Sequence, residues 1–114
     1  MILHIAERGD WESAQRDGEY QPKGFTDDGF IHCSTPEQVL SVANAFYRGR
    51  GGLVLLAIDE SRLQAELKWE PPADAPASAE LFPHLYGALN LDAVERALPF
   101  EPDAAGGFTL SPLP

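Results

Sequence analysis

The chain has 114 residues, of which 44% are hydrophobic and 23% charged, enough for one domain with its own core and too few for two. Eight Lys and Arg against eighteen Asp and Glu give a formal net charge of −10, which repels nucleic-acid phosphates and anionic lipid surfaces. The longest continuous apolar run, at 53–58, is far shorter than the roughly 20 residues that cross a bilayer. We therefore expect neither nucleic acid nor a membrane among its partners.

The single cysteine, Cys33, indicates a reducing compartment, because one thiol cannot form an intrachain disulfide. The first ten residues lack the basic region and the long apolar stretch of a secretory signal. We expect a cytoplasmic protein in which residues 1–114 form a single domain held together by packing.

The first third of the chain predicts strands joined by turns and one short helix. Residues 1–6 are apolar except for His4, which is typical of a strand. A helix of about two turns is expected from Asp10, a good capping residue, to Gly18, which ends it. Turn-forming residues then lead into a second strand at 30–34.

The clearest helix boundary follows that second strand. Ser34 and Thr35 offer capping hydroxyls, Pro36 suits the first helical position, and Glu37 lies three residues after Ser34, as a capping box requires. Apolar side chains then recur at spacings of three and four. The pattern predicts a helix over 36–47.

The rest of the chain predicts further strands around one proline-rich loop. The apolar run 53–58 indicates a strand buried on both faces at the centre of the sheet, and 67–70 alternates as a half-exposed strand does. Residues 70–79 form either a solvated connector or a binding element. Residues 93–100 fit a helix or a strand, and the glycines before 108–110 suggest a last hairpin.

The three histidines, His4, His32 and His84, all lie in or beside apolar stretches. A buried ring nitrogen without a partner costs about 1–3 kcal/mol, so each ring must find partners in the fold or contact a ligand. We expect at least one of them to contact a ligand, because imidazole is the commonest acid and base near neutral pH. Their separations of 28 and 52 residues match no local metal motif, so no metal is predicted.

A small anion is compatible with this acidic chain. The amides at the start of the helix after Ser34, together with His32, could hold a phosphate or pyrophosphate. Cys33 is expected to point into the core, and the adjacent His32 faces the other way on the strand, which makes it a poor base for the thiol. Tyr86 is either a core residue or a stacking platform for a ligand.

Several short segments of the sequence resemble those of the family known as domain of unknown function 952. They are ILHIA (2–6), GFIHCST (29–35), VANAFY (42–47), LVLLAID (53–59), KWE (68–70) and FPHLYGALNLDAV (82–94). That family is similar in its expected fold to the ADP-ribosyltransferases, which bind NAD in a cleft between two small sheets. The resemblance implies an α+β fold with ADP-ribosyltransferase-like split sheets and a few short helices.

The resemblance also implies roles for individual residues. His4 would contact the adenylate side of NAD, and His32 and Ser34 would line the nicotinamide side. The late-strand glutamate of the transferases has only a loose match, in Asp92 or Glu95. The arginines that RNA 2'-phosphotransferases need are scattered in this chain, so that activity is not carried over. The expected catalytic residues are His32, His84 and Asp92, and the expected ligand-binding residues are His4, His32, Ser34, Thr35, Tyr86 and Asn90.

We therefore expect a protein that binds NAD or another ADP-ribose-containing nucleotide in a histidine-lined cleft. Its chemistry, if it is an enzyme, would be cleavage or transfer at the N-glycosidic bond of nicotinamide. The alternative is a non-catalytic module that uses the proline-rich loop and residues 82–90 to recognise a small ligand or a protein. A histidine-metal hydrolase ranks third.

Overall fold

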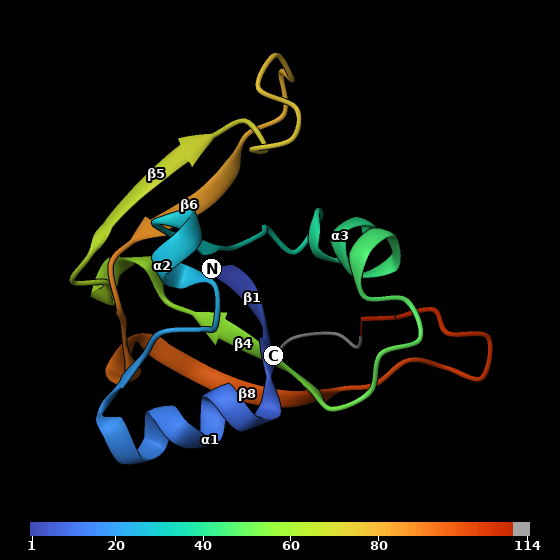
Figure 1. Ribbon diagram of the computed structural model, residues 1–114, viewed down its shortest axis with the longest axis horizontal. Helices are drawn as coiled ribbons and strands as arrows, with labels where there is room; N and C mark the ends of the chain where they lie inside the picture. Colours follow the sequence, from blue (N-terminus) through green and yellow to red (C-terminus); the bar gives the residue numbers. More distant parts are fainter. Residues whose placement is uncertain (111–114) are drawn as a thin grey trace.

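The computed structural model describes residues 1–110, which form a mixed α/β fold of antiparallel sheets with a few short helices (Figure 1). One three-stranded sheet has the order β1-β4-β8, another has the order β3-β6-β5, and β2 pairs with β7. The elements are β1 (Ile2–Glu7), α1 (Arg8–Asp17), β2 (Glu19–Tyr20), α2 (Phe25–Asp28), β3 (Ile31–His32), α3 (Val39–Phe46), β4 (Leu53–Ile58), η1 (Glu60–Arg62), β5 (Glu66–Glu70), β6 (Phe82–Tyr86), β7 (Leu89–Asn90), η2 (Leu91–Ala93) and β8 (Val94–Phe100).

Strand β4 is the centre of the first sheet and is buried along its whole length. It pairs with β1 in a register that sets Leu56 opposite His4, and with β8 on its other edge. The prediction of a central strand buried on both faces is confirmed. The physical reason is that helices and loops cover both faces of this sheet, so polar residues have no exposed face to occupy.

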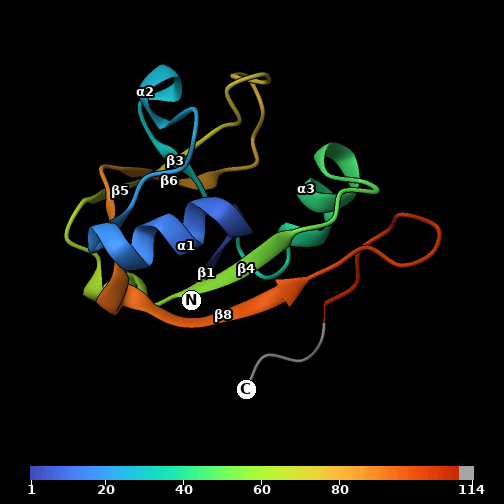
Figure 2. The same cartoon turned by 60° about the horizontal axis from the view of Figure 1, so that its bottom comes forward.

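Alternate residues of β1 and β4 enter two different hydrophobic cores. Ile2 and Leu56 pack with Tyr20 and with Ala14 of α1, which runs alongside β1 and β4 (Figure 2). The opposite face packs against α3 and the C-terminal segment, through Leu3, Ile5, Val39, Ala43, Leu53, Leu55, Ala57, Phe100 and Phe108.

The two three-stranded sheets are joined where the chain passes from β3 toward α3. Ile31 and His32 pair with Leu85 and His84 of β6. Two residues later, Ser34 exchanges backbone hydrogen bonds of 2.7 and 2.8 Å with Leu3 of β1. Away from this bridge the sheets are separate, with β5 and β6 on one side and β4 and β8 on the other (Figures 1 and 2).

The bridge also explains why α3 begins at Val39 and not at residue 36 as predicted. Ser34 uses its backbone amide and carbonyl to pair with Leu3, so it continues a strand and does not cap a helix. The reciprocal hydrogen bonds of a capping box form one residue later. Thr35 Oγ1 accepts from the Gln38 amide at 3.2 Å, and Gln38 Oε1 accepts from the Thr35 amide at 3.0 Å.

Three further expectations are corrected or decided. Helix α1 begins at Arg8, so Asp10 lies inside the first turn and does not cap it. Residues 94–100 are a strand, β8, because they pair with β4. The predicted last hairpin is wrong, since 108–110 form no strand. Phe108 instead stacks on Phe100 with ring centroids 4.7 Å apart, and this contact fixes the segment by packing.

Within residues 1–110, we find no helix that combines the length and the apolar character needed to pass through a lipid bilayer.

Candidate functional site

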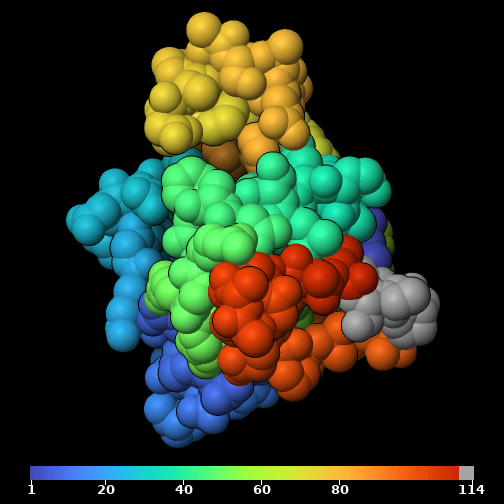
Figure 3. All heavy atoms as spheres, turned by 90° about the vertical axis from the view of Figure 1, so that its right-hand side faces the viewer, coloured from blue at the N-terminus to red at the C-terminus, as the bar shows by residue number. Residues whose placement is uncertain are grey.

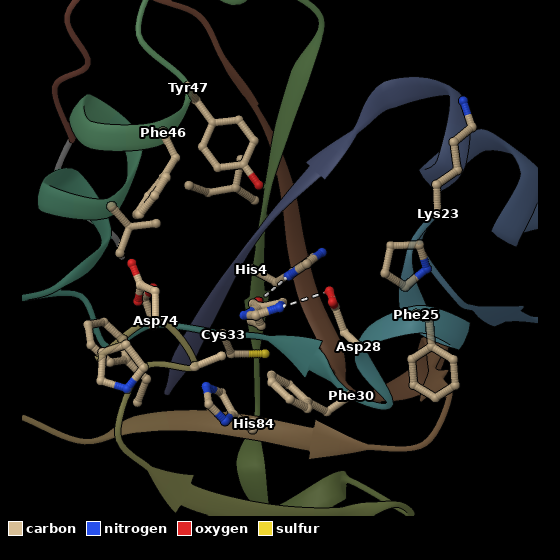
Figure 4. A pocket seen from close by; sticks show the side chains of 18 of the residues that line it. His4, Lys23, Phe25, Asp28, Phe30, Cys33, Phe46, Tyr47, Asp74 and His84 are labelled. Carbon is tan, nitrogen blue, oxygen red and sulfur yellow. Dashed lines mark hydrogen bonds and ion pairs between the residues drawn. The ribbon is translucent and has the colours of Figure 1, made fainter. Parts of the chain in front are cut away.

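A pocket of about 860 Å³ lies at the bridge between the two sheets (Figure 4). Its wall takes residues from β1, β3 and β6, from α3, from the segment that contains α2, and from the loop between β5 and β6. A volume of this order matches sites that enclose drug-sized or nucleotide-sized ligands. All three histidines of the chain and Ser34 line it.

His4 is buried, and both of its ring nitrogens have partners. Nδ1 lies 2.6 Å from the carbonyl oxygen of His32, and Nε2 lies 2.8 Å from the hydroxyl of Tyr20. A carbonyl can only accept, so Nδ1 carries the proton, and the Tyr20 hydroxyl donates to Nε2. Burial lowers the pKa of His4 to about 4, so the ring is neutral at pH 7. His4 can offer a ligand its ring surface but no free hydrogen-bonding atom.

His84 is also buried, but only one of its ring nitrogens has a partner among residues 1–110. Nδ1 lies 2.9 Å from Oε1 of Glu70, and the Tyr86 hydroxyl donates to the same carboxylate. These two hydrogen bonds, that from Tyr86 first, hold the pKa of Glu70 below its ordinary value. Phe30 stacks on the His84 ring with centroids 4.1 Å apart, so the imidazole is held from one side and at one end.

His32 lies opposite His84 in the β3–β6 pair, and the two ring centroids are 5.6 Å apart. Its side chain is 55% exposed, and Nε2 lies 3.0 Å from Oδ2 of Asp28, four residues earlier in α2. Phe30 also contacts it, with ring centroids 4.6 Å apart. His32, Phe30 and His84 therefore form one aromatic wall of the pocket.

Ser34 and Cys33 line the pocket beside this wall. Ser34 Oγ makes no hydrogen bond to a residue within 1–110, so the hydroxyl is available to a ligand. Cys33 is 3% exposed, in keeping with its predicted place in the core, and burial raises the pKa of its thiol to about 12. The thiol therefore stays protonated and is a weak nucleophile.

Charges in the pocket wall are mostly negative but not evenly distributed. Two cations, Lys23 and Arg50, approach the same carboxylate, Glu7, at 3.9 and 2.7 Å, and so lie close to one another. The remaining carboxylates belong to other parts of the wall. They are Asp10, Asp28, Asp74 and Glu80.

The loop between β5 and β6 forms one side of the pocket and stands out beyond α3 in the surface view (Figure 3). Gln38 Nε2 donates to the carbonyl of Leu81 at 2.8 Å and to Glu80 at 3.3 Å, which ties the end of this loop to the turn before α3. Phe46, 66% exposed on α3, lies at the pocket with Tyr47 (Figure 4). The proline-rich segment therefore borders the pocket, a position that its interpretation as a binding element requires.

Four of the expected site residues, Thr35, Tyr86, Asn90 and Asp92, do not line this pocket. The side chain of Asn90 accepts from the Gln64 amide and donates to Asp92, so both belong to a network that holds the turn at η2. Thr35 is hydrogen-bonded to Gln38, and the Tyr86 hydroxyl donates to Glu70. The structure gives Asp92 no place beside a ligand in this pocket.

Other residues of the site had no distinctive signal in the sequence. Asp28 and His32 are four residues apart across a turn, a weak signal of contact. Nothing local distinguishes the remainder, because they reach the pocket only through the packing of α3 and the two sheets. These are Glu7, Lys23, Phe30, Phe46, Tyr47, Arg50 and Asp74.

The side chains of residues 1–110 include no group of three or more His, Cys, Asp or Glu placed to hold a metal ion. His4 has no free nitrogen, and His84 uses Nδ1 on Glu70. The arrangement therefore lends no support to the histidine-metal hydrolase.

Comparison with known proteins identifies the family. Residues 5–97 match the family described as "Protein of unknown function (DUF952)", so the chain belongs to that family. It is similar to the crystal structure of protein CC0527 from Caulobacter crescentus, with 36% identity, a TM-score of 0.83, and 96% of this chain and 93% of that chain covered. The solution NMR structure of CC0527 gives 36% identity and a TM-score of 0.76, over 93% of this chain and 89% of that one. The search of curated proteins found no match.

Proposed function

We propose that this member of the DUF952 family is a cytoplasmic protein that binds NAD or another ADP-ribose-containing nucleotide in the pocket between its two sheets. One observation carries the proposal. All three histidines of the chain, from three strands far apart in the sequence, meet in a single pocket with the free hydroxyl of Ser34. Packing accounts for His4, whose two ring nitrogens are both bonded within the protein, but it gives no reason for His32 and His84 to lie at the same pocket.

The charge pattern of the pocket supports a dinucleotide and suggests its orientation. Lys23 and Arg50 lie together at Glu7, where a pyrophosphate could replace the Glu7 carboxylate as the partner of the two cations. NAD also carries a positive charge on its nicotinamide ring, which an acidic and aromatic wall favours. We place the nicotinamide toward Phe30, His32 and Asp28, and the phosphates toward Arg50.

Cleavage or transfer at the N-glycosidic bond requires a carboxylate near the oxocarbenium-like centre. Asp92 cannot supply this carboxylate, because it accepts a hydrogen bond from Asn90 in the turn at η2 and does not line the pocket. The pocket offers Asp28, Asp74 and Glu80 in its place. Asp28 is the one of these that contacts a histidine, His32, at 3.0 Å.

The second candidate is a non-catalytic binding module. The exposed Phe46 at the pocket favours it, because an apolar side chain at a pocket rim adds contact area without chemistry. This candidate predicts binding without turnover.

The first experiment is an amide NMR titration with NAD, ADP-ribose, nicotinamide and ATP, followed overnight for released nicotinamide. Shifts clustered at residues 4, 28–34, 46–50 and 72–84 support the nucleotide site. Released nicotinamide makes the protein an enzyme, and binding without release makes it a module. If none of the four compounds shifts these amides, the nucleotide proposal fails.

A matched pair of variants tests the place of binding. His32→Ala removes an exposed ring from the pocket wall and should weaken binding while leaving the fold intact. Arg96→Ala is the control, because Arg96 is an exposed residue of β8 outside the pocket. Equal affinity of both variants would remove His32 from the site.

A further inference from the structure

His4 and His84 are both buried beside the pocket, yet they differ in how many of their ring nitrogens have a partner in the protein. His4 has both ring nitrogens occupied by the protein. His84 is 3% exposed and uses only Nδ1, on Glu70. Every side-chain nitrogen or oxygen that is sealed from solvent within residues 1–110 has a hydrogen-bond partner. Nε2 of His84 has none there, so it must open into the pocket that the residue lines.

The bond to Glu70 fixes which nitrogen of His84 carries the proton. A carboxylate near neutral pH can only accept, so Nδ1 is the donor, and whenever the ring carries a single proton Nε2 keeps its lone pair. Figure 4 shows one nitrogen of His84 directed into the pocket. The pocket therefore contains a hydrogen-bond acceptor that no residue within 1–110 satisfies.

Neighbouring side chains hold this arrangement in place. Glu70 pairs with Phe82 of β6, and Phe82 lies two residues before His84. The side chains of Glu70 and His84 therefore project from the same face of the sheet. The Tyr86 hydroxyl donates to the same oxygen of Glu70, and Phe30 stacks on the imidazole. Supporting contacts of this kind orient an imidazole for a ligand.

We propose that Glu70 is a positioning residue that fixes His84 as a hydrogen-bond acceptor, and that the ligand places an O–H or N–H donor on His84 Nε2. Ribose hydroxyls and the nicotinamide carboxamide both supply such a donor, whereas a carboxylate in the same place would face the lone pair. The part that concerns the ligand rests on the proposed function. The part that concerns Glu70 does not.

The ligand-free protein tests the role of Glu70. Long-range nitrogen–proton NMR of the imidazoles distinguishes the two tautomers, and we expect the Nδ1–H form for His84 in the parent. Glu70→Leu removes the acceptor and should convert His84 to the Nε2–H form, whereas Glu70→Gln keeps a carbonyl acceptor and should preserve it. Glu66→Leu, on the same face of β5 but opposite Tyr86, is the control and should change nothing.

Two outcomes would overturn the assignment to Glu70. One is a proton on Nε2 of His84 in the parent protein, either as the Nε2–H tautomer or as the doubly protonated ring. The other is a Glu70→Leu spectrum identical to that of the parent. If Glu70→Leu does not fold, the parent and Glu70→Gln spectra decide the question.

Titration with three probes tests the donor. Nicotinamide and ADP-ribose carry donors and should move the His84 Nε2 resonance, whereas nicotinate, which has the shape of nicotinamide without its N–H groups, should not. Glu70→Leu should weaken ADP-ribose binding about tenfold, the effect of one lost hydrogen bond. A shift by nicotinate equal to that by nicotinamide, or no shift with either donor, overturns the inference. A shift by nicotinamide when neither NAD nor ADP-ribose binds overturns only the proposed function.

Discussion

The imidazole of His4 donates from Nδ1 to the carbonyl oxygen of His32 at 2.6 Å and thereby ties β1 to β3 beside the bridge that joins the two sheets. The bond runs between strands of different sheets, so it helps to set the width of the pocket that lies between them. His4 thus shapes the site, although it has no nitrogen to give a ligand.

His4→Leu should destabilise the protein by about 2–4 kcal/mol, because it leaves the His32 carbonyl and the Tyr20 hydroxyl unpaired in the interior. Tyr20→Phe removes only one hydrogen bond and should cost about 1 kcal/mol. Urea unfolding measures both values. Equal losses for the two variants would contradict the role assigned to the His32 carbonyl bond.

Stability should fall as the pH decreases from about 6.5 to about 4. Burial lowers the pKa of His4 to about 4, so between these values the unfolded chain binds a proton that the folded chain refuses. The contribution is complete above pH 6.5, and roughly 3 kcal/mol is lost by pH 4. His4→Gln, which does not titrate, should show a flatter curve in this window when the free energy of unfolding is measured at several pH values. Parallel curves would contradict the prediction.

Gly87 directly follows β6, the strand that carries His84, and its conformation and surroundings favour glycine. Its φ is +155°, and an added Cβ would lie 2.8 Å from the Cβ of Ala65. Gly87→Ala should therefore destabilise the protein by about 1–3 kcal/mol. Gly9→Ala is the control, since Gly9 lies in α1 with open space around it, and should stabilise by about 0.5–1 kcal/mol. Thermal unfolding of the two variants should move in opposite directions.

Cys33 should react with iodoacetamide only when the protein unfolds. Burial raises the pKa of its thiol to about 12, and the side chain is 3% exposed, so at pH 8 the reactive thiolate is scarce and shielded. Labelling followed by mass spectrometry should be slow in buffer and fast in urea. Rapid labelling of the native protein would show that the pocket exposes the sulfur.

Phe46→Ala should leave the free energy of unfolding within about 0.5 kcal/mol of the parent, because the side chain is 66% exposed. It should still weaken ADP-ribose binding, since Phe46 lies at the pocket. Trp69→Ala is the control, an aromatic residue 43% exposed on β5 outside the pocket. Calorimetric titration of both variants provides the comparison, and unchanged affinity in Phe46→Ala would exclude it from the site.

Much of the fold was predictable because its signals are local. The apolar run 53–58, the alternation at 67–70 and the glycine after α1 each specify their own structure through burial pattern or turn chemistry. The start of α3 was not predictable in this way. Ser34 has the chemistry of a cap, but pairing with Leu3 on a distant strand takes its backbone into a sheet.

The candidate site divides in the same manner. The sequence by itself showed that the three histidines lie in or beside apolar stretches of the chain, and it predicted that each needs a partner or a ligand. The tertiary structure alone decided which partner each one has: His4 is satisfied by Tyr20 and the His32 carbonyl, whereas His84 is held by Glu70 with Nε2 left open. The structure also places Asn90 and Asp92, which were expected at the site, away from the pocket, and it places Phe30 and Arg50 in the pocket wall. The physical reason is that such contacts depend on strand register and on where two sheets meet, and neither is encoded in the spacing of residues along the chain.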